Sequence, residues 1–399
     1  MSSLTSAGSP GHRYRHPVRR VSWGIAAVLA LTAACSSGGE TVSAARPSVS
    51  ASGAASLAGV CPATVIVQSN WWAQAEDGAV YHLLGGDLQV DKQHKRVTGS
   101  LVADGVDTGV KLQIRSGGPA NGFVPAASVL YTDPSVLLAT ADTDQVMQLA
   151  ARRPVKAVVA PMERSPVVLM FDPAQHSFRT ISDIGKTDTR VLYFQGATYM
   201  EYLVGSGQLK RSQVDPGYAG TPDRWVAARG SIVQQGFLTN EPFAYENELP
   251  AWDKRVAWLL VADAGYPVYP ETLTIRPDHE RANAACLERL VPIIQRSAVG
   301  YLADPGATNA LIVRLTQDYD AYPYSPQRAA YAAKVMRDNG IVGNGPDETL
   351  GNFDRARVTR LLDIVRTVFA RTGQPLPTGL TVDDVVTNAY IDPRVGAGS

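Results

Sequence analysis

Short apolar segments alternate with helix-like segments along most of the chain, and this alternation constrains the fold more than any other feature. Thr64 to Val67 is an apolar run rich in β-branched residues, as expected of a buried strand, and Glu76 to Leu84 has the pattern of a helix. The same order recurs at 190–194 and 198–204. Strands that alternate with helices favour an α/β architecture with mainly parallel sheets.

Further elements follow from the same patterns. Helix 353–371 is the clearest, because apolar residues form a stripe along it, Asn352 is placed to cap its start and Gly373 to end it. From Asp278 onward the chain is expected to be mostly helical. Apart from these, we expect a helix at 145–151 and strands at 110–114, 155–160, 166–171 and 256–262.

Length, apolar content and net charge limit the fold classes and the functions that this chain can have. A chain of 399 residues is too long for one ordinary core, so two lobes are expected. The apolar content of 45% is that of a soluble globular protein. The formal net charge is +0, which argues against a nucleic-acid partner, since that function needs an excess of clustered Lys and Arg.

The N-terminus has the features of an export signal. Residues 1–20 contain four arginines and no acidic residue, and 23–34 is an apolar run too short to span a bilayer. The segment 31–35 resembles a lipoprotein signal in which Cys35 receives the lipid, although Thr32 stands where such signals prefer Leu. The alternative is a plain secreted protein. Arg19 and Arg20 leave both the general and the twin-arginine export routes open.

A flexible tether is expected after the signal peptide 1–34. Residues 35–60 are rich in Ser, Ala and Gly and too polar to form a core, so the folded part is expected to begin near Cys61. With Cys35 assigned to lipidation, Cys61 and Cys286 remain as an even pair in an oxidising location. Either they form a disulfide, or they are two separate buried thiols.

Catalytic motifs are incomplete wherever they begin. The segment ending in Gly185 and Lys186 resembles a phosphate-binding loop, but Thr180 occupies the position of its first glycine. His279 begins a zinc-protease pattern, but Asn283 occupies the position of the second histidine. We therefore expect no catalytic residue, no metal site, no cofactor and no enzymatic activity.

Five segments carry a resemblance to a known family: 70–81, 138–142, 155–160 with 165–166, 181–186 and 235–243. Together they resemble solute-binding proteins for nitrate, sulfonates, riboflavin-like compounds and thiamine pyrimidines. The resemblance extends from about Cys61 to Val365 and implies the type II periplasmic-binding fold, with two lobes that each contain a mixed, mainly parallel sheet flanked by helices. Lobe 1 would comprise 61–164 and 268–399, and lobe 2 would comprise 165–267.

The resemblance places the ligand between the lobes. Tryptophans beside acids favour a planar nitrogen-containing heterocycle, and an oxyanion of the sulfonate or nitrate type is the alternative. Several of the candidates could have structural roles instead of binding ligand. Both tryptophans could pack in the core, Glu76 could stabilise the positive end of a helix dipole, and Thr198 could cap a helix. The candidate ligand-binding residues are Trp71, Trp72, Glu76, Thr140, Arg164, Ser165, Gln195, Gly196, Thr198 and Glu241.

The resemblance also implies a biological role. The expected protein is a monomeric, extracytoplasmic binding protein, lipid-anchored to the cell membrane, that delivers a small molecule to the permease of an ABC importer. Two other functions stay open: an enzyme on the same fold, and a surface module that binds a protein partner.

Overall fold

The computed structural model describes residues 49–50 and 56–398. These residues belong to one compact unit. The predicted signal peptide 1–34, the lipidation site Cys35 and most of the predicted tether lie outside the described residues. Among the helices of the described part, none has both the length and the apolar character needed to cross a membrane.

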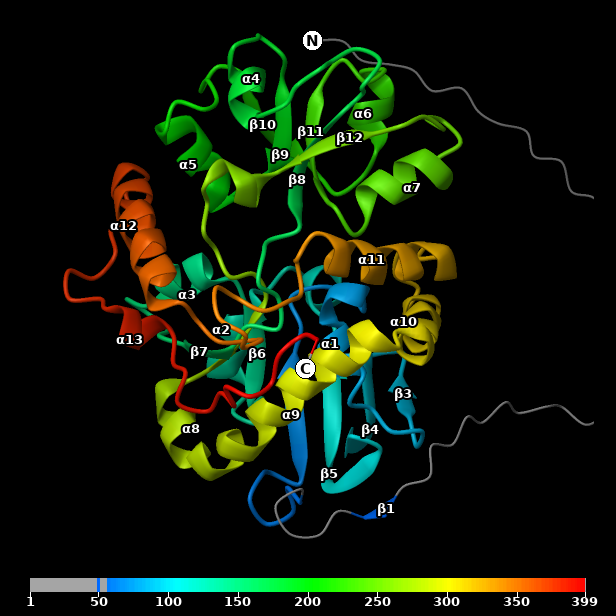
Figure 1. Ribbon diagram of the computed structural model, residues 1–399, viewed down its shortest axis with the longest axis vertical. Helices are drawn as coiled ribbons and strands as arrows, with labels where there is room; N and C mark the ends of the chain where they lie inside the picture. Colours follow the sequence, from blue (N-terminus) through cyan, green and yellow to red (C-terminus); the bar gives the residue numbers. More distant parts are fainter. Residues whose placement is uncertain (1–48, 51–55, 399) are drawn as a thin grey trace, which may run out of the picture. The chain divides into compact units, whose positions relative to one another are not determined.

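Two mixed sheets form the framework (Figure 1). The large sheet has eight strands in the order β3-β4-β5-β2-β6-β13-β7, with β1 beside β5, and the small sheet has the order β10-β9-β11-β8-β12. The strands of the large sheet are β1 Val49–Ser50, β2 Thr64–Gln68, β3 Gln89–Asp91, β4 Arg96–Ala103, β5 Val106–Arg115, β6 Leu138–Ala141, β7 Lys156–Val159 and β13 Thr272–Ile275. Those of the small sheet are β8 Val167–Phe171, β9 Val191–Phe194, β10 Val214–Tyr218, β11 Val233–Phe237 and β12 Ala257–Leu260.

The α/β prediction is confirmed, but parallel pairing is less extensive than expected. Parallel neighbours are β1 and β5, β5 and β2, and β2 and β6 in the large sheet, and β10 and β9, and β9 and β11, in the small one. The strands β8 and β13, which the chain enters directly after crossing between the sheets, run antiparallel to both of their neighbours. The crossings therefore reverse the strand direction at these positions.

A hairpin that the pattern analysis missed adds more antiparallel pairing. Strands β4 and β5 are joined by Asp104 and Gly105, which both have positive φ, at 50° and 80°. Two left-handed residues in a two-residue loop form the turn whose twist matches that of paired strands, and Asp-Gly is a favoured sequence for it. This dipeptide was the available signal.

Helices flank both sheets. Figure 1 shows α4 to α7 around the small sheet. These four are α4 Ile181–Gly185, α5 Thr198–Gly205, α6 Asp223–Ala227 and α7 Glu241–Asn247. The others are α1 Gly78–Tyr81, α2 Ala126–Thr132, α3 Thr143–Leu149, α8 Pro277–Ala282, α9 Ala284–Ala303, α10 Gly306–Asp318, α11 Pro326–Asp338, α12 Arg355–Arg371 and α13 Val382–Val385.

Strand alternation divides the core between two apolar clusters. Neighbours Ile66 and Val67 on β2 belong to different clusters, because successive side chains of a strand point to opposite faces of its sheet. One cluster includes the apolar face of α9. The other includes that of α12, which lies against α3 and α5 (Figure 1).

The predicted C-terminal helix is present, with a different cap. Helix α12 begins at Arg355, and the Asp354 side chain accepts a hydrogen bond from the Ala356 N–H at 2.9 Å. The expected cap, Asn352, lies too early and donates to Asp347 instead, at 2.8 Å. Asp is as good a cap as Asn, so the sequence pattern alone did not discriminate between the two positions.

The remaining cysteines form a disulfide. Cys61 and Cys286 are 225 positions apart in sequence, their Cα atoms lie 4.7 Å apart, and their sulfur atoms are bonded. The bond ties the start of the described fold to α9, and it confirms the bridged alternative over two separate thiols.

Candidate functional site

Four chain segments converge at one edge of the large sheet. Strand β2 runs parallel to β6, and β13 runs antiparallel to β6, so the carboxyl ends of β2 and β6 and the amino end of β13 share this edge. Thr140 lies on β6, Glu271 directly precedes β13, and Glu76 and Asp77 lie in a 3-10 helix that follows β2. These four residues line a cavity of about 10 Å³, which is about the space of one water molecule.

Glu271 is buried with incomplete hydrogen bonding. Its Oε1 lies 3.5 Å from the amide nitrogens of both Asn70 and Gln74, and its Oε2 has no hydrogen-bond partner among the described residues. Its φ of 45° is in the left-handed region, which residues with a side chain rarely adopt, and its N–H donates to Asp142 Oδ1 at 2.8 Å. Backbone strain of this kind is often retained at functional sites.

Thr140 and Asp77 bring two more polar side chains to the cavity. The Oγ1 of Thr140, a residue only 3% exposed, has no hydrogen-bond partner in the part of the chain that the structure describes. Asp77 is buried and accepts from Ser69 Oγ at 2.9 Å. When ionised, the carboxylates of Glu76, Asp77 and Glu271 only accept hydrogen bonds, whereas the Thr140 hydroxyl can accept or donate.

Burial and mutual repulsion disfavour ionisation of the lining acids. Burial raises the pKa of Glu76, and it raises that of Asp77 to about 7, with a smaller contribution from the Glu76 charge. Burial also raises the pKa of Glu271 well above its usual range, with further contributions from Asp77, Glu76 and Asp142. No Lys, Arg or His lines the cavity.

Three tyrosines lie near Glu76. The Tyr324 hydroxyl accepts from the Ala75 N–H at 3.4 Å, and the Tyr322 and Tyr324 rings meet edge to face at 5.6 Å. Burial raises the pKa values of Tyr301, Tyr322 and Tyr324, and the Glu76 charge is the next cause in each case. Among the described residues that line the cavity itself, none is a tyrosine.

Residues near the small sheet reach the same acids. The Thr239 hydroxyl, beyond the end of β11, donates to Glu76. Glu241, in the first turn of α7, accepts from the Phe237 N–H at 2.7 Å and from the Tyr218 hydroxyl at 2.9 Å. Its charge also contributes to raising the pKa of Glu76, after burial. Contacts from segments that carry the two different sheets therefore meet at Glu76.

A second pair of acids lies beside this cluster. Asp144 accepts from the Tyr266 hydroxyl at 2.5 Å, and burial raises its pKa while the nearby Thr198 side chain, at the start of α5, lowers it. Burial raises the pKa of Asp142 to about 7, with a further contribution from the Asp144 charge. Asp142 links this pair to Glu271 through the Glu271 N–H.

The predicted tryptophans lie outside the cavity lining. The Trp71 ring lies 6.1 Å from the Phe123 ring and covers Gly118, where an added Cβ would be 2.4 Å from it. Trp72 packs against the large apolar cluster. Of the predicted ligand residues, Glu76 and Thr140 line the cavity, and the Glu241 charge raises the pKa of Glu76. Thr198 influences Asp144, which lies outside the lining.

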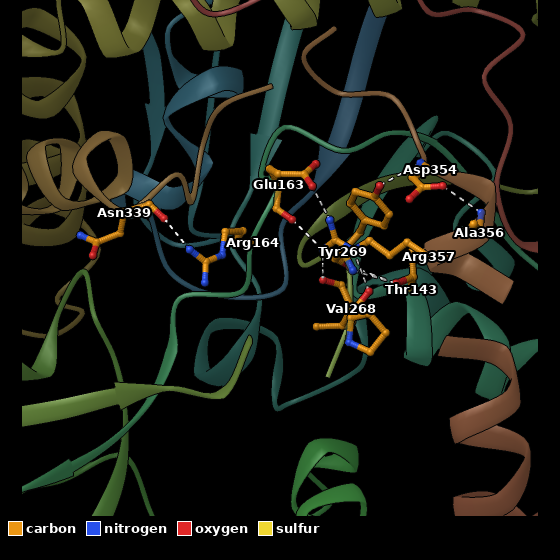
Figure 2. Close-up of polar contacts among 10 residues, drawn as sticks. Thr143, Glu163, Arg164, Val268, Tyr269, Asn339, Asp354, Ala356 and Arg357 are labelled. Atoms are coloured by element: carbon orange, nitrogen blue, oxygen red, sulfur yellow. Dashed lines mark hydrogen bonds and ion pairs between the residues drawn. The ribbon is translucent and has the colours of Figure 1, made fainter. Parts of the chain in front are cut away.

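The other predicted residues are elsewhere. Gln195 and Gly196 are exposed in the loop after β9. Ser165 is buried at the first crossing between the sheets, where its Oγ accepts from the Val167 N–H at 3.4 Å. Arg164, at the same crossing, pairs with Asp263 and donates to the Asn339 carbonyl at 3.1 Å (Figure 2). These contacts join the first crossing to two other segments.

Arg357 of α12 connects both crossings, as Figure 2 shows. Its guanidinium pairs with the Glu163 carboxylate and donates to the Glu163 carbonyl at 2.7 Å, on the first crossing. On the second crossing it donates to the carbonyls of Pro267 at 2.9 Å and Val268 at 2.7 Å, and it lies 3.7 Å from the Tyr269 ring centroid. One side chain therefore holds the two segments that join the sheets.

Sequence reasoning did not select five of the residues found here. They belong to the acid cluster or donate to it: Asp77, Asp142, Asp144, Thr239 and Glu271. Glu271 was missed because β13 was missed, and only that strand brings position 271 to the edge where β6 ends. An acid directly before a short β-branched run was the available signal. Within the described residues, no group of three or more His, Cys, Asp or Glu is arranged to hold a metal ion.

Comparisons with known proteins identify the fold. No protein-family model matches the sequence, and no curated protein matches it. Solved structures do match: the periplasmic aliphatic sulphonate binding protein SsuA from Escherichia coli has a TM-score of 0.52 at 14% identity, over 85% of this chain and 95% of that one. The periplasmic sulfonate-binding protein SsuA from Methylobacillus flagellatus KT has a TM-score of 0.51 at 10% identity, over 82% and 92%.

A third solved structure also matches. The ligand-binding component of an ABC-type import system from Staphylococcus aureus, with zinc bound, has a TM-score of 0.50 at 12% identity, over 82% of this chain and 97% of that one. Identities this low establish the fold alone. The chain has the fold of the periplasmic solute-binding proteins of ABC importers, with two sheets flanked by helices.

Proposed function

We propose that this protein is the extracytoplasmic solute-binding component of an ABC importer and that it encloses a small nitrogen-containing solute. The lobes would be 61–164 with 268–399, built on the large sheet, and 165–267, built on the small sheet. The fold of the compared binding proteins supports the role. Solute would enter when the lobes separate, because the cavity of about 10 Å³ holds no more than a water molecule.

The ligand class is inferred from the hydrogen-bond acceptors at the cavity. Glu76, Asp77 and Glu271 present carboxylates there, and Thr140 presents an unpaired hydroxyl. A solute with N–H groups satisfies such acceptors, and the tyrosines near Glu76 would offer flat surfaces to a planar ring. We therefore favour a nitrogen heterocycle. A sulfonate, which the compared SsuA proteins are named for, would place its negative charge beside three acids with no cationic residue in the lining.

A ligand screen tests this proposal. In calorimetric titrations at neutral pH, amino-substituted pyrimidines and related heterocycles are expected to bind, and alkanesulfonates and nitrate are not. Glu271→Gln is expected to weaken binding by about 1.5–3 kcal/mol, the usual contribution of a hydrogen bond to a charged group. Chemical turnover of the bound solute would contradict a pure binding role.

A matched control separates the site from general effects of the substitution. Glu288 lies on α9 with an exposed side chain, so Glu288→Gln makes the same chemical change away from the cavity. It is expected to leave affinity unchanged. Tight binding of a sulfonate that is unaffected by Glu271→Gln would overturn the heterocycle assignment while leaving the importer role in place.

Anchoring at Cys35 belongs to the same proposal. A lipid on Cys35 would hold the binding domain at the outer face of the membrane through the segment 35–60. Cys35→Ser is therefore expected to move the protein from the membrane fraction to the medium, or to leave it uncleaved. Incorporation of labelled palmitate, measured in the parent and the variant, checks the result, and equal labelling of both would exclude lipidation at Cys35.

A further inference from the structure

We infer that the cavity is a site for an organic cation and that the positive charge of the solute is what allows the two lobes to close. This inference rests on the proposed function and names its ligand class. The evidence is the arrangement of buried acids described above, the unpaired oxygens of Glu271 and Thr140, and the charged groups that surround them.

The enclosed state brings together acids that repel one another. Glu271 experiences the charges of Asp77, Glu76 and Asp142, and Glu76 experiences that of Glu241. Glu76, Asp77 and Glu271 are each at most 7% exposed. Burying ionised carboxylates without a counter-charge is strongly unfavourable, so the empty site opposes its own closure at neutral pH.

Side chains around the cluster supply little compensation. Within the described residues, the ion pairs involve other acids, and none is formed by Glu76, Asp77, Asp142, Asp144, Glu241 or Glu271. Burial raises the pKa of Glu241, and the charge of Arg328 on α11 lowers it by a smaller amount. The Arg328 guanidinium itself pairs with Glu248 and donates to Asn240 Oδ1 at 3.0 Å. The other titratable groups that face the cluster are neutral phenols: Tyr81, Tyr218, Tyr266, Tyr301, Tyr322 and Tyr324.

The lining favours an organic cation. Val80, Met162 and Leu273 contribute apolar surface to the same cavity as the carboxylates, and Tyr322 and Tyr324 lie near Glu76. Carboxylates for the charge, aromatic faces for cation–π contact and apolar contacts for the carbon skeleton are the combination that recognises ammonium or amidinium groups. Such a solute gains from both lobes at once, because Thr239 and Glu241 approach Glu76 from the second lobe.

Protonation of the buried acids should favour closure as a bound cation does, so the inference can be tested without a ligand. Asp77 has an ordinary pKa of 3.8 and a pKa of about 7 in the enclosed state, so the closed form binds one more proton between these values. Closure is therefore favoured as pH falls from about 7 to about 4, by about tenfold per pH unit for each such group, and the dependence ends below that range.

Small-angle scattering of the purified protein measures the effect. The ligand-free parent is expected to become more compact between pH 7.5 and pH 5. Glu271→Gln, which removes one repelling charge, is expected to be more compact than the parent at pH 7.5 and equal to it at pH 5, whereas Glu288→Gln behaves as the parent. If Glu271→Gln fails to fold by circular dichroism, Asp77→Asn takes its place. A radius of gyration that does not change with pH, or is the same in parent and variant, would sink the inference.

Charge selectivity is tested with defined probes at equal ionic strength. Methylammonium chloride at pH 7.5 is expected to raise the melting temperature and compact the parent, and to have less effect on Glu271→Gln. Sodium methanesulfonate and sodium chloride are expected to do neither. An equal effect of sodium chloride would indicate screening, and stabilisation by methanesulfonate or by zinc chloride alone would identify another ligand class; each result overturns the inference. Failure of every solute in the calorimetric screen would instead count against the proposed importer role.

Discussion

Reduction of the Cys61–Cys286 disulfide is expected to lower the free energy of unfolding by about 5 kcal/mol. The bond closes a segment of 225 residues, and the entropy that such a loop removes from the unfolded chain gives this value, with about 2–5 kcal/mol usual in practice. Cys61 follows the fully buried Leu57, and Cys286 is fully buried on α9, so the link also fixes the N-terminal segment to the core.

Urea unfolding of three samples isolates the contribution of the disulfide to the free energy of unfolding. The oxidised parent, the parent in reductant and the double variant Cys61→Ala/Cys286→Ala are compared. The difference between the two parent samples measures the bond, and the difference between the reduced parent and the variant measures the loss of sulfur packing. Equal urea midpoints for the oxidised and reduced parent would show that the link does not constrain the unfolded chain.

Arg357→Ala is expected to destabilise the protein by about 3–5 kcal/mol. The substitution leaves Glu163 without its ionic partner and removes the donor from the carbonyls of Glu163, Pro267 and Val268. Removing one partner of a largely buried ion pair typically has an effect of this size, because the remaining charge stays desolvated. Since these carbonyls lie on both crossings, a looser connection between the two sheets is expected as well.

Two further variants show whether the geometry or the charge is responsible. Arg357→Lys keeps the charge but lacks the planar fork that reaches several acceptors, so it should recover only part of the loss. Arg360→Ala removes an exposed arginine from the same helix and should change stability by no more than about 0.5 kcal/mol. If Arg357→Ala and Arg360→Ala unfold at the same urea concentration, the contacts of Arg357 with the two crossings do not contribute to stability.

Prediction of the individual elements succeeded where a pattern is local. The strands at 64–67 and 166–171 and the helix at 355–371 were found because apolar periodicity records which face each element buries. Strand β13 was not found, although its four residues alternate between Thr and an aliphatic side chain; the run is short, and all four side chains are buried. The missed hairpin at Asp104 and Gly105 did carry a local signal.

Prediction of the site succeeded only in part, for a related reason. Glu76 and Thr140 were selected because they lie in the segments 70–81 and 138–142, which carry the resemblance to solute-binding proteins, and both line the cavity. Glu271 is 195 positions from Glu76, and the two meet only through the register of β13 against β6. Trp71 was selected for its ring, but the ring covers Gly118 instead of the cavity, and this depends on how the chain turns after β5.

By itself the sequence determined the fold class and the location of several strands and helices, and it predicts an export-type N-terminus with a polar tether. These follow from local periodicity, propensity and composition, which depend on neighbours a few residues away. The tertiary structure alone decided that Cys61 and Cys286 are bonded, that Arg357 joins both crossings, and that carboxylates from distant segments share one cavity. Those features depend on which strands become neighbours and in what order, and local hydrophobic patterns do not encode that order.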